Sequence, residues 1–536
     1  MRLIWLGVAA AFLAACSEDP AESQPPAQEV FELRSPAATG FAAMTLPQLV
    51  SALEDGGISS VTLTQTYLQR IEQVDFSGPR LQSVLALNPD AIAQAEASDA
   101  RRAAGETLGP LDGVPILLKD NIETLDPIPT TAGSLALKDN VTGRDSPLVA
   151  GLRAQGAIIL GKTNLSQWAN FRSNDSISGW SSVGGQVRNP HMLDRSPCGS
   201  SSGSGAAVAA SLAAGAVGTE TNGSIICPSQ VNGIVGFKPT VGVLPQEGIV
   251  PISASQDTAG PMTKTVTGAA LLMDAMTGEA VYASALDANS LNGVRVGVLR
   301  FAQGSNADIQ TLFDRALSDL ETAGAILVEI DAFTPDAENF GADALAVLQY
   351  EFKDGLNAYL ATTPESVTTR TLANIIAFNA AESRELTLFD QSLFDASEAR
   401  GPLTDEDYIR AREAVQSATR ENGIDALMAE YDVSVLIAPS GPVSSRVDPI
   451  NGDVWPAWAG AGWMAAIAGY PNVTVPMGDV HGVPVGVSFM ASGGDDAAVL
   501  SYAYAYEQVS QRRIEPQYLV GAEERPEIAA AMSAQR

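Results

Sequence analysis

Short apolar runs alternate with helical patterns along most of this 536-residue chain. Such runs, when bounded by turn residues, are typical of buried strands, whereas apolar residues spaced three and four apart are typical of helices. We expect strands at residues 84–87, 114–118, 158–160, 233–237, 294–299, 325–330, 433–438, 473–475 and 485–490. Because helical segments separate most of these runs, the sequence predicts an α/β fold with helices on both faces of a central sheet.

The helical segments also bear on domain organisation. Two helices are predicted within residues 46–74, broken at Gly56-Gly57, and a third over residues 91–104, ended by Gly105. Residues 335–430 are the most helical part, and we expect them to form a cap over the sheet. Length alone would suggest three or four domains of about 150 residues, but no linker or repeat interrupts residues 41–520. We therefore predict a single domain over residues 41–525.

Charge and composition exclude several classes of protein. The chain carries 62 Asp and Glu against 31 Lys and Arg, and this net charge of −31 opposes binding to nucleic acids. Since 46% of residues are hydrophobic and only 17% charged, a large core can form and a disordered chain is excluded. With two His, three Cys and no Cys pair at zinc-knuckle spacing, a structural zinc or a c-type haem is not expected.

The N-terminus has the features of a secretory signal. Arg2 precedes an apolar run over residues 3–15 that is too short to span a bilayer. Leu13-Ala-Ala-Cys16 resembles the bacterial lipobox, whose cysteine is acylated and becomes the first mature residue. We expect residues 1–15 to be a signal peptide, residues 16–40 a flexible tether behind a lipidated Cys16, and the protein to be periplasmic or at the cell surface, touching the membrane only through its lipid. The alternative is an ordinary signal peptide with an incidental cysteine.

Two motifs match familiar patterns but lack the required context. Residues 156–163 fit G-x-x-x-x-G-K-[ST], yet the variable positions are themselves a predicted strand, so no loop remains to wrap a phosphate. Residues 199–203 fit the G-x-S-x-G elbow of α/β-hydrolases, but the preceding residues are predicted loop and the downstream histidine, His481, lies in a predicted turn. A Ser-His-Asp hydrolase therefore stays a minor alternative.

Gly and Ser are unusually dense in residues 198–261. Residues 199–205 lead into a helix of small residues, and a second polar turn follows at residues 218–224. A flexible linker would not have such apolar, regular flanks, so the two serine-bearing turns are expected to be buried around one helix, where unpaired N–H groups favour a developing oxyanion. Lys119 ends an apolar strand, where partial desolvation lowers the pKa of an ammonium and suits it to act as a base.

Together these segments resemble the amidase signature family. The resemblance rests on the Lys119 strand, the turn at 161–164, the Ser/Gly segment and the runs at 130–135, 235–240, 256–261, 469–476 and 482–486. It implies a large central mixed β-sheet covered by helices. It also implies hydrolysis of amides by a Ser-cisSer-Lys triad through an acyl-enzyme, with no metal or cofactor. The substrate would be a small-molecule or peptide amide.

The resemblance maps the triad onto three residues of this chain. Ser224 would be the nucleophile, Ser200 the bridging serine after a cis peptide bond, and Lys119 the base. Ser201 would supply a supporting hydroxyl. The backbone N–H groups of the oxyanion hole would come from Thr221, Asn222, Gly223 and Ser224.

The match departs from the family pattern at three positions. Cys198 stands where glycine is frequent, Asn222 where glycine or alanine is, and Ile226 where arginine is, which removes an ion-pair partner for Glu220. The segments 196–205 and 223–228 look most like the bacterial peptide amidases, which remove the C-terminal amide of peptides. Cys198 and Cys227 flank both turns, and the sequence leaves a disulfide and two buried thiols equally open.

The acyl group is not readable from the sequence. Trp455, Trp458 and Trp463 would suit an apolar or peptide substrate, although core packing is the commoner role of a tryptophan. Aryl or fatty amide hydrolysis within the same family is therefore an alternative. A second alternative, suggested by the tether and the α/β pattern, is a lipid-anchored periplasmic solute-binding protein.

Overall fold

The computed structural model describes residues 37–534. Its central feature is an eleven-stranded mixed sheet with the strand order β1-β3-β2-β6-β8-β7-β12-β13-β11-β9-β10, so the predicted α/β fold is confirmed. Its strands are β1 (Val84–Leu87), β2 (Pro115–Lys119), β3 (Ile158–Thr163), β6 (Gly215–Glu220), β7 (Val235–Lys238), β8 (Thr258–Thr263), β9 (Arg295–Leu299), β10 (Ile326–Ile330), β11 (Val435–Pro439), β12 (Asn472–Val480) and β13 (Val483–Met490). β4 (Trp180–Ser181) and β5 (Gly185–Gln186) pair separately. The predicted signal peptide and Cys16 lie outside the described residues.

Strand direction divides the sheet into three parts. β3, β2 and β6 run parallel at one end, and β11, β9 and β10 run parallel at the other. Between them β8, β7, β12 and β13 pair antiparallel. As β2 and β6 are parallel neighbours, their carboxyl ends meet at one edge of the sheet, which brings Lys119 beside the end of β6.

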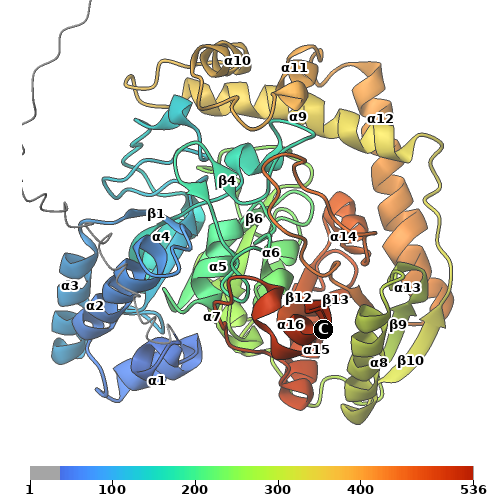
Figure 1. The fold of residues 1–536 in the computed structure, drawn as a ribbon, viewed down its shortest axis with the longest axis horizontal. Helices are drawn as coiled ribbons and strands as arrows, with labels where there is room; N and C mark the ends of the chain where they lie inside the picture. The colour runs from blue at the N-terminus through green and yellow to red at the C-terminus, as the bar shows by residue number, and fades with distance from the viewer. Residues whose placement is uncertain (1–36, 535–536) are drawn as a thin grey trace, which may run out of the picture. The chain divides into compact units, whose positions relative to one another are not determined.

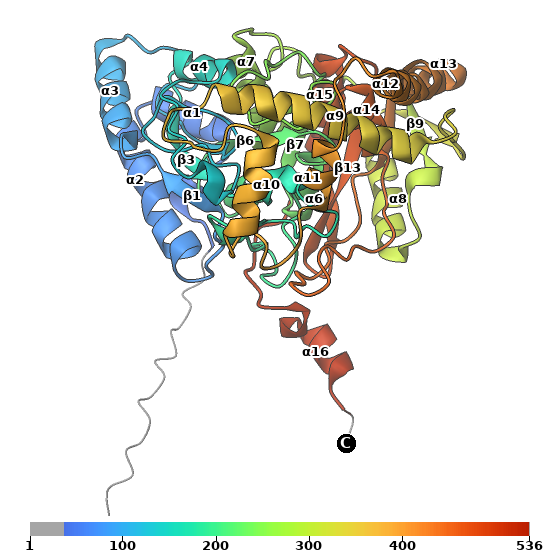
Figure 2. The same cartoon turned by 90° about the horizontal axis from the view of Figure 1, so that it is seen from above.

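Helices surround this sheet (Figure 1). They are α1 (Leu46–Glu54), α2 (Ser60–Arg70), α3 (Ala91–Ala104), α4 (Pro147–Ala154), α5 (Ser202–Ala209), α6 (Ile226–Val231), α7 (Val266–Thr277), α8 (Ala307–Thr322), α9 (Phe340–Ala361), α10 (Leu372–Ala381), α11 (Ser392–Glu398), α12 (Glu406–Thr419), α13 (Asp425–Tyr431), α14 (Gly462–Ala468), α15 (Asp496–Ser510) and α16 (Pro526–Met532). Figure 1 and Figure 2 both place α1 to α3 at the β1 end of the sheet and α8 and α13 at the β9 end. Between residues 37 and 534, no helix is both long and apolar enough to cross a membrane.

The predicted helices form because of local signals at their ends. α1 and α2 are separate, and Thr45 with Gln48 closes a capping box at the start of α1. α3 covers the predicted residues and ends where Gly105 adopts a left-handed φ of 74°, a conformation that glycine tolerates best.

Two strands that the sequence pattern missed lie at the centre of the sheet. β6 and β8 consist mainly of Gly, Ala and Thr, and both are fully buried. α5, also fully buried, packs against β6. In α5 a Cβ at Gly203 would lie 2.3 Å from the carbonyl oxygen of Ser83, so this contact requires glycine. The Ser/Gly segment is therefore closely packed core.

Residues 335–430 do form helices, but they do not cap the sheet directly. One hydrophobic cluster joins α9, α10 and α11 to the loops around residues 132–137, 168–171 and 250–252. These loops follow β2, β3 and β7, so the helices cover the loops that surround the site described next.

Candidate active site

Lys119, at the end of β2, is completely buried. Its ammonium nitrogen donates to Ser200 Oγ at 2.8 Å, to Thr219 Oγ1 at 2.8 Å and to the Thr219 carbonyl oxygen at 3.1 Å. Burial lowers the pKa of Lys119 to about 7, while the negative charges of Asp257 and Glu220 oppose the shift. A lysine with this pKa is partly neutral near pH 7 and can accept a proton.

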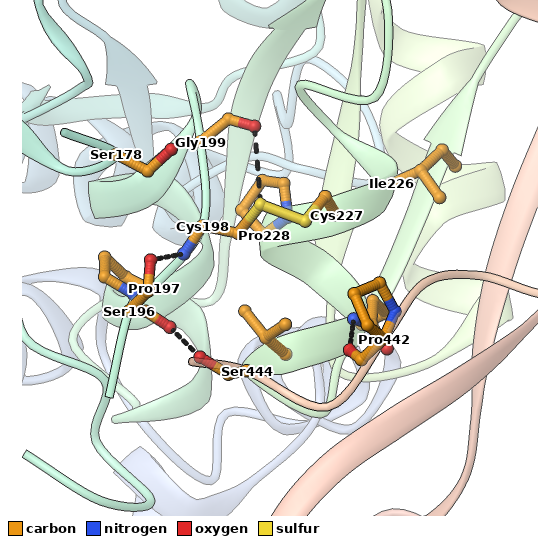
Figure 3. The surroundings of a disulfide bond; sticks show 12 residues. Ser178, Ser196, Pro197, Cys198, Gly199, Ile226, Cys227, Pro228, Pro442 and Ser444 are labelled. Atoms are coloured by element: carbon orange, nitrogen blue, oxygen red, sulfur yellow. Dashed lines mark hydrogen bonds between the residues drawn. A yellow bond between two sulfur atoms is a disulfide. The ribbon is translucent and has the colours of Figure 1, made fainter. Parts of the chain in front are cut away.

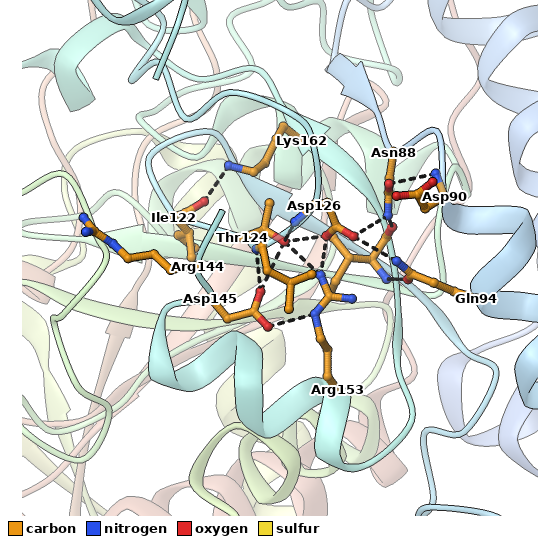
Figure 4. A network of polar contacts seen from close by, with 12 residues as sticks. Asn88, Asp90, Gln94, Ile122, Thr124, Asp126, Arg144, Asp145, Arg153 and Lys162 are labelled. Atoms are coloured by element: carbon orange, nitrogen blue, oxygen red, sulfur yellow. Dashed lines mark hydrogen bonds and ion pairs between the residues drawn. The ribbon is translucent and has the colours of Figure 1, made fainter. Parts of the chain in front are cut away.

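The loop after β2 is anchored by a buried polar network (Figure 4). Asp126 accepts hydrogen bonds from Asn88, Gln94 and Thr124 and pairs with Arg153. Lys162 donates to the carbonyl oxygen of Ile122 at 2.5 Å and to Thr130 Oγ1 at 2.8 Å. Lys162, whose motif resembles a phosphate-binding loop, lies on the buried strand β3 and anchors the loop after β2.

Ser200 and Ser201 lie just before α5. The peptide bond between Gly199 and Ser200 is cis. Ser201 Oγ donates to the carbonyl oxygen of Thr219 at 3.0 Å and accepts from its N–H at 3.2 Å. The Ser201 N–H donates to the carbonyl oxygen of Ser224 at 3.1 Å. Ser201 thus ties β6 and the second serine turn to the first.

The second turn, residues 221–224, joins β6 to α6. Gly223 adopts a left-handed φ of 82°. Within residues 37–534, the N–H groups of Asn222, Gly223 and Ser224 donate to no acceptor. The turn is held from below by Glu220, whose Oε2 accepts from the N–H groups of the two residues after Ser224, at 2.7 and 3.0 Å. Its free donors are arranged to bind an oxyanion.

The structure thus gathers Lys119, Ser200, Ser201 and Ser224 in one place. Lys119 and Ser200 are hydrogen-bonded, whereas no hydrogen bond joins the hydroxyls of Ser200 and Ser224 in the described part of the chain. Ser224 is 8% exposed and Ser200 is fully buried, so a substrate reaches Ser224 first. Catalytic contacts of this kind often close only when substrate binds.

A cavity of about 560 Å³ opens beside these turns. Cys198, Gly199, Asn222 and Gly223 contribute to one part of its wall. Other lining residues come from segments far along the chain: Asn170, Ser178, Asp453, Trp455, Trp458 and Trp463. The volume is within the range of sites that take drug-sized ligands.

Cys198 and Cys227 are joined by a disulfide that lies in the cavity wall (Figure 3). The bond connects the residue before Gly199 to α6, which follows the second turn. The indole of Trp455 packs against the same cluster. Both serine turns are therefore covalently linked at the edge of the site.

Neither histidine belongs to the site. His191 is buried and bonded through Nε2 to the carbonyl oxygen of Asn232, and burial lowers its pKa to about 4. The side chain of His481 is 56% exposed in the turn between β12 and β13. No group of three or more His, Cys, Asp or Glu within residues 37–534 is arranged to hold a metal ion.

Comparison with known proteins agrees with this geometry. The family model described as Amidase matches residues 62–500. The chain belongs to the amidase signature family. A probable amidase of Arabidopsis thaliana is 36% identical over 501 residues, covering 89% of this chain and 91% of that protein. A putative amidase of Schizosaccharomyces pombe is 33% identical over 516 residues, covering 88% of this chain and 86% of that protein.

Among solved structures, the chain is similar to peptide amidases. The native peptide amidase of Stenotrophomonas maltophilia superposes with a TM-score of 0.84 at 44% identity, covering 89% of this chain and 99% of that one. The peptide amidase PAM in complex with the competitive inhibitor chymostatin gives a TM-score of 0.84 at 45% identity, over the same shares of each chain. This amidase is therefore an amide hydrolase with a peptide amidase-like structure.

Several residues of the amidase site were not singled out from the sequence. Thr219 contacts Lys119 and Ser201, and Asn121 donates to Thr219 Oγ1 at 3.0 Å. Asp257 accepts from Thr221 Oγ1 at 2.5 Å. Thr219 was assigned to a turn because β6 was missed, whereas Asn121 and Asp257 lie inside runs that carry the family resemblance.

Proposed function

We propose that this amidase hydrolyses amides through an acyl-enzyme on Ser224. The observation that carries the proposal is the buried hydrogen bond between Lys119 and Ser200, because it provides a proton acceptor near neutral pH without histidine. Neutral Lys119 takes the proton of Ser200, which takes the proton of Ser224 as its oxygen bonds to the substrate carbonyl carbon. The N–H groups of the turn at 221–224 stabilise the oxyanion.

The second half of the reaction reverses these transfers. The proton returns from Lys119 through Ser200 to the amide nitrogen, the C–N bond breaks, and ammonia or an amine leaves. Water then adds to the acyl group on Ser224 and gives up a proton to the same relay. The relay returns this proton through Ser200 to Ser224 Oγ as the acyl bond breaks, and the carboxylic acid is released.

Peptide C-terminal amides are the substrates that we propose. The likeness to peptide amidases and the cavity of about 560 Å³ beside Ser224 support this class over amides with a very small acyl group. Aryl and fatty amides are the competing class within the family. Initial rates across matched peptide, aryl and fatty amides would separate them, and a preference for fatty amides would overturn the peptide assignment.

Substitution of Ser224 tests the mechanism. Ser224→Ala should lower kcat at least a thousandfold while keeping the fold and the affinity for a product peptide. Ser229→Ala is the matched control, because Ser229 is a buried serine on the adjoining α6 whose hydroxyl has no hydrogen-bond partner in the described chain. Full turnover by Ser224→Ala would show that Ser224 is not the nucleophile.

We further propose that the mature enzyme is a lipoprotein anchored at Cys16 outside the bacterial cytoplasm. The proposal is supported by the lipobox-like Leu13-Ala-Ala-Cys16 after an apolar run. A Cys16→Ala protein should move from the membrane fraction to the soluble fraction. Unchanged membrane partitioning would contradict lipidation at this residue.

A further inference from the structure

The cavity beside Ser224 has an uneven charge distribution. None of its lining residues is Lys, Arg or His, whereas Glu220 and Asp453 both contribute carboxylates. Glu220 is 1% exposed and accepts hydrogen bonds from the N–H groups at the start of α6, so its carboxylate is buried beneath the cavity. Asp453 is only partly buried, and its carboxylate is the charge that a ligand in the cavity can reach.

Asp453 is held in place mainly by Ser178, which also lines the cavity. Its Oδ1 accepts from the N–H of Ser178 at 3.0 Å, and its Oδ2 accepts from Ser178 Oγ at 2.5 Å. Ser178 Oγ in turn accepts from Asn170 Nδ2 at 3.1 Å. The side chain of Trp455 also donates a hydrogen bond to this carboxylate. Because a carboxylate offers about four acceptor positions, it can still accept from one further donor.

Aromatic rings lie next to this carboxylate. Trp455 and Trp458 follow Asp453 on the same loop, and their rings pack edge to face with centroids 5.8 Å apart. Trp458 is 49% exposed and Trp455 is partly exposed. A carboxylate beside accessible indole rings is a combination that binds organic cations, since both attract positive charge.

We propose, on the basis of the amide hydrolysis proposed above, that Asp453 with Trp455 and Trp458 forms a subsite for a positive charge carried near the scissile carboxamide. The ligand chemistry is an alkylammonium or guanidinium group. It could be supplied by a basic side chain of the substrate or by a free α-amino group in an amino-acid or dipeptide amide. An acidic group at the same place would meet the Asp453 carboxylate and be disfavoured.

Matched N-acetylated amides of lysine, norleucine and glutamate test the side-chain source. Assays are run at pH 8, because burial raises the pKa of Asp453 and the carboxylate must be ionised. We expect kcat/KM to be about fivefold to tenfold higher for the lysine amide than for the norleucine amide, and lowest for the glutamate amide. The preference should shrink as salt is raised to about 0.5 M. Phenylalanine amide and its N-acetyl derivative, compared at pH 7, test the α-amino source.

Asp453→Asn keeps the size of the side chain and removes its charge. It should reduce the lysine-to-norleucine ratio to below about twofold, chiefly by lowering kcat/KM for the lysine amide. Asp453→Lys should reverse the order of the lysine and glutamate amides. Asp354→Asn is the control, because it removes the same charge at an exposed position on α9 that does not line the cavity.

Three results would overturn the subsite. They are a wild-type ratio near one for both cation sources, an unchanged ratio in Asp453→Asn, or an equal loss for all substrates in that variant, which would mean that Asp453 only holds its loop. Absence of any amide hydrolysis by the wild-type enzyme would instead contradict the proposed function. If only the basic side chain or only the free α-amino group raises kcat/KM, that group is the ligand of the subsite.

Discussion

Lowering the pH below 7 should switch this enzyme off through one group, Lys119. The side chain is completely buried, and burial lowers its pKa from 10.5 to about 7. At pH 7 an ordinary lysine is neutral in about one molecule in three thousand, whereas a lysine of pKa 7 is neutral in half. The buried site thus raises the population of the reactive base by about three orders of magnitude.

The pH dependence follows from the sign of this shift. Only neutral Lys119 accepts a proton, so kcat/KM should be constant above about pH 8 and fall tenfold per pH unit below about pH 6.5, to about 1% of the plateau at pH 5. The assay is kcat/KM from pH 5 to 10 with an N-acetylated norleucine amide, which does not titrate in this range. Circular dichroism at each pH confirms that the enzyme stays folded.

Asp257, which accepts a hydrogen bond from Thr221 of the second turn, titrates close to Lys119 and can change the shape of the acid limb. Burial raises the pKa of Asp257 to about 6, so it titrates just below Lys119, and its charge, with that of Glu220, opposes the shift of Lys119. Protonation of Asp257 would lower the pKa of Lys119 further, so it would make the acid limb shallower than one proton. A limb of slope one with a midpoint near pH 7 therefore identifies Lys119 as the group that titrates.

Two variants complete the test. Lys119→Arg keeps the positive charge but cannot lose its proton, so it should be inactive at every pH up to 10. Lys119→Met removes the charge and should also be inactive, while keeping the fold. A wild-type profile that is flat between pH 5.5 and 8, or a variant that keeps the wild-type profile, would refute the assignment of Lys119 as the base.

Three further predictions concern stability. Replacing both Cys198 and Cys227 by Ser removes a bond that closes a loop with a sequence separation of 29 residues. The loss should cost about 3.6 kcal/mol and lower the melting temperature by about 3–4 °C in calorimetry. In a Cys16→Ser protein that keeps Cys198 and Cys227, two free thiols after denaturation without reduction would contradict the bond. Gly203→Ala should destabilise far more than Gly223→Ala in thermal unfolding, because its Cβ would lie 2.3 Å from a backbone oxygen whereas the Cβ at Gly223 meets nothing within 4 Å; equal losses would contradict this packing. Asp126→Ala should cost about 2 kcal/mol in urea unfolding, since Arg153 then keeps only Asp145 as an ion-pair partner and the side chains of Asn88 and Gln94 lose an acceptor, and a loss below about 1 kcal/mol would show that the network is dispensable.

The sequence predicted most of the sheet because most strands are runs of Val, Ile and Leu. The exceptions, β6 and β8, have the sequences Gly-Ala-Val-Gly-Thr-Glu and Thr-Ala-Gly-Pro-Met-Thr, which carry the propensities of turns. Close packing demands small side chains in both strands: a Cβ at Gly218 in β6 would lie 2.8 Å from Ser201 Oγ at the start of α5, and one at Gly260 in β8 would lie 2.0 Å from the carbonyl oxygen of Phe237. Such a demand comes from tertiary structure and leaves no periodicity to detect.

Prediction of the candidate site was limited by distance along the chain. Lys119 is visible as a charge at the end of an apolar run, and the serines were located by resemblance. Asp453 has no local signal at all: it meets Ser178, 275 residues away, only because the loop after β11 packs against the loop before β4. Local patterns do not encode such a contact, so the subsite became visible only in three dimensions.

The near absence of histidine and the size of the sheet are connected. A histidine has a pKa close to 7 without help, whereas a lysine reaches that value only when burial or a neighbouring positive charge disfavours its charged form. Here the lysine ends β2, a fully buried strand that lies between two parallel neighbours and is anchored beyond its end by the network around Asp126. A large sheet favours such complete burial, because more of its interior lies far from the surface. If Lys119 is the base, the large single sheet therefore supports the chemistry as well as the fold.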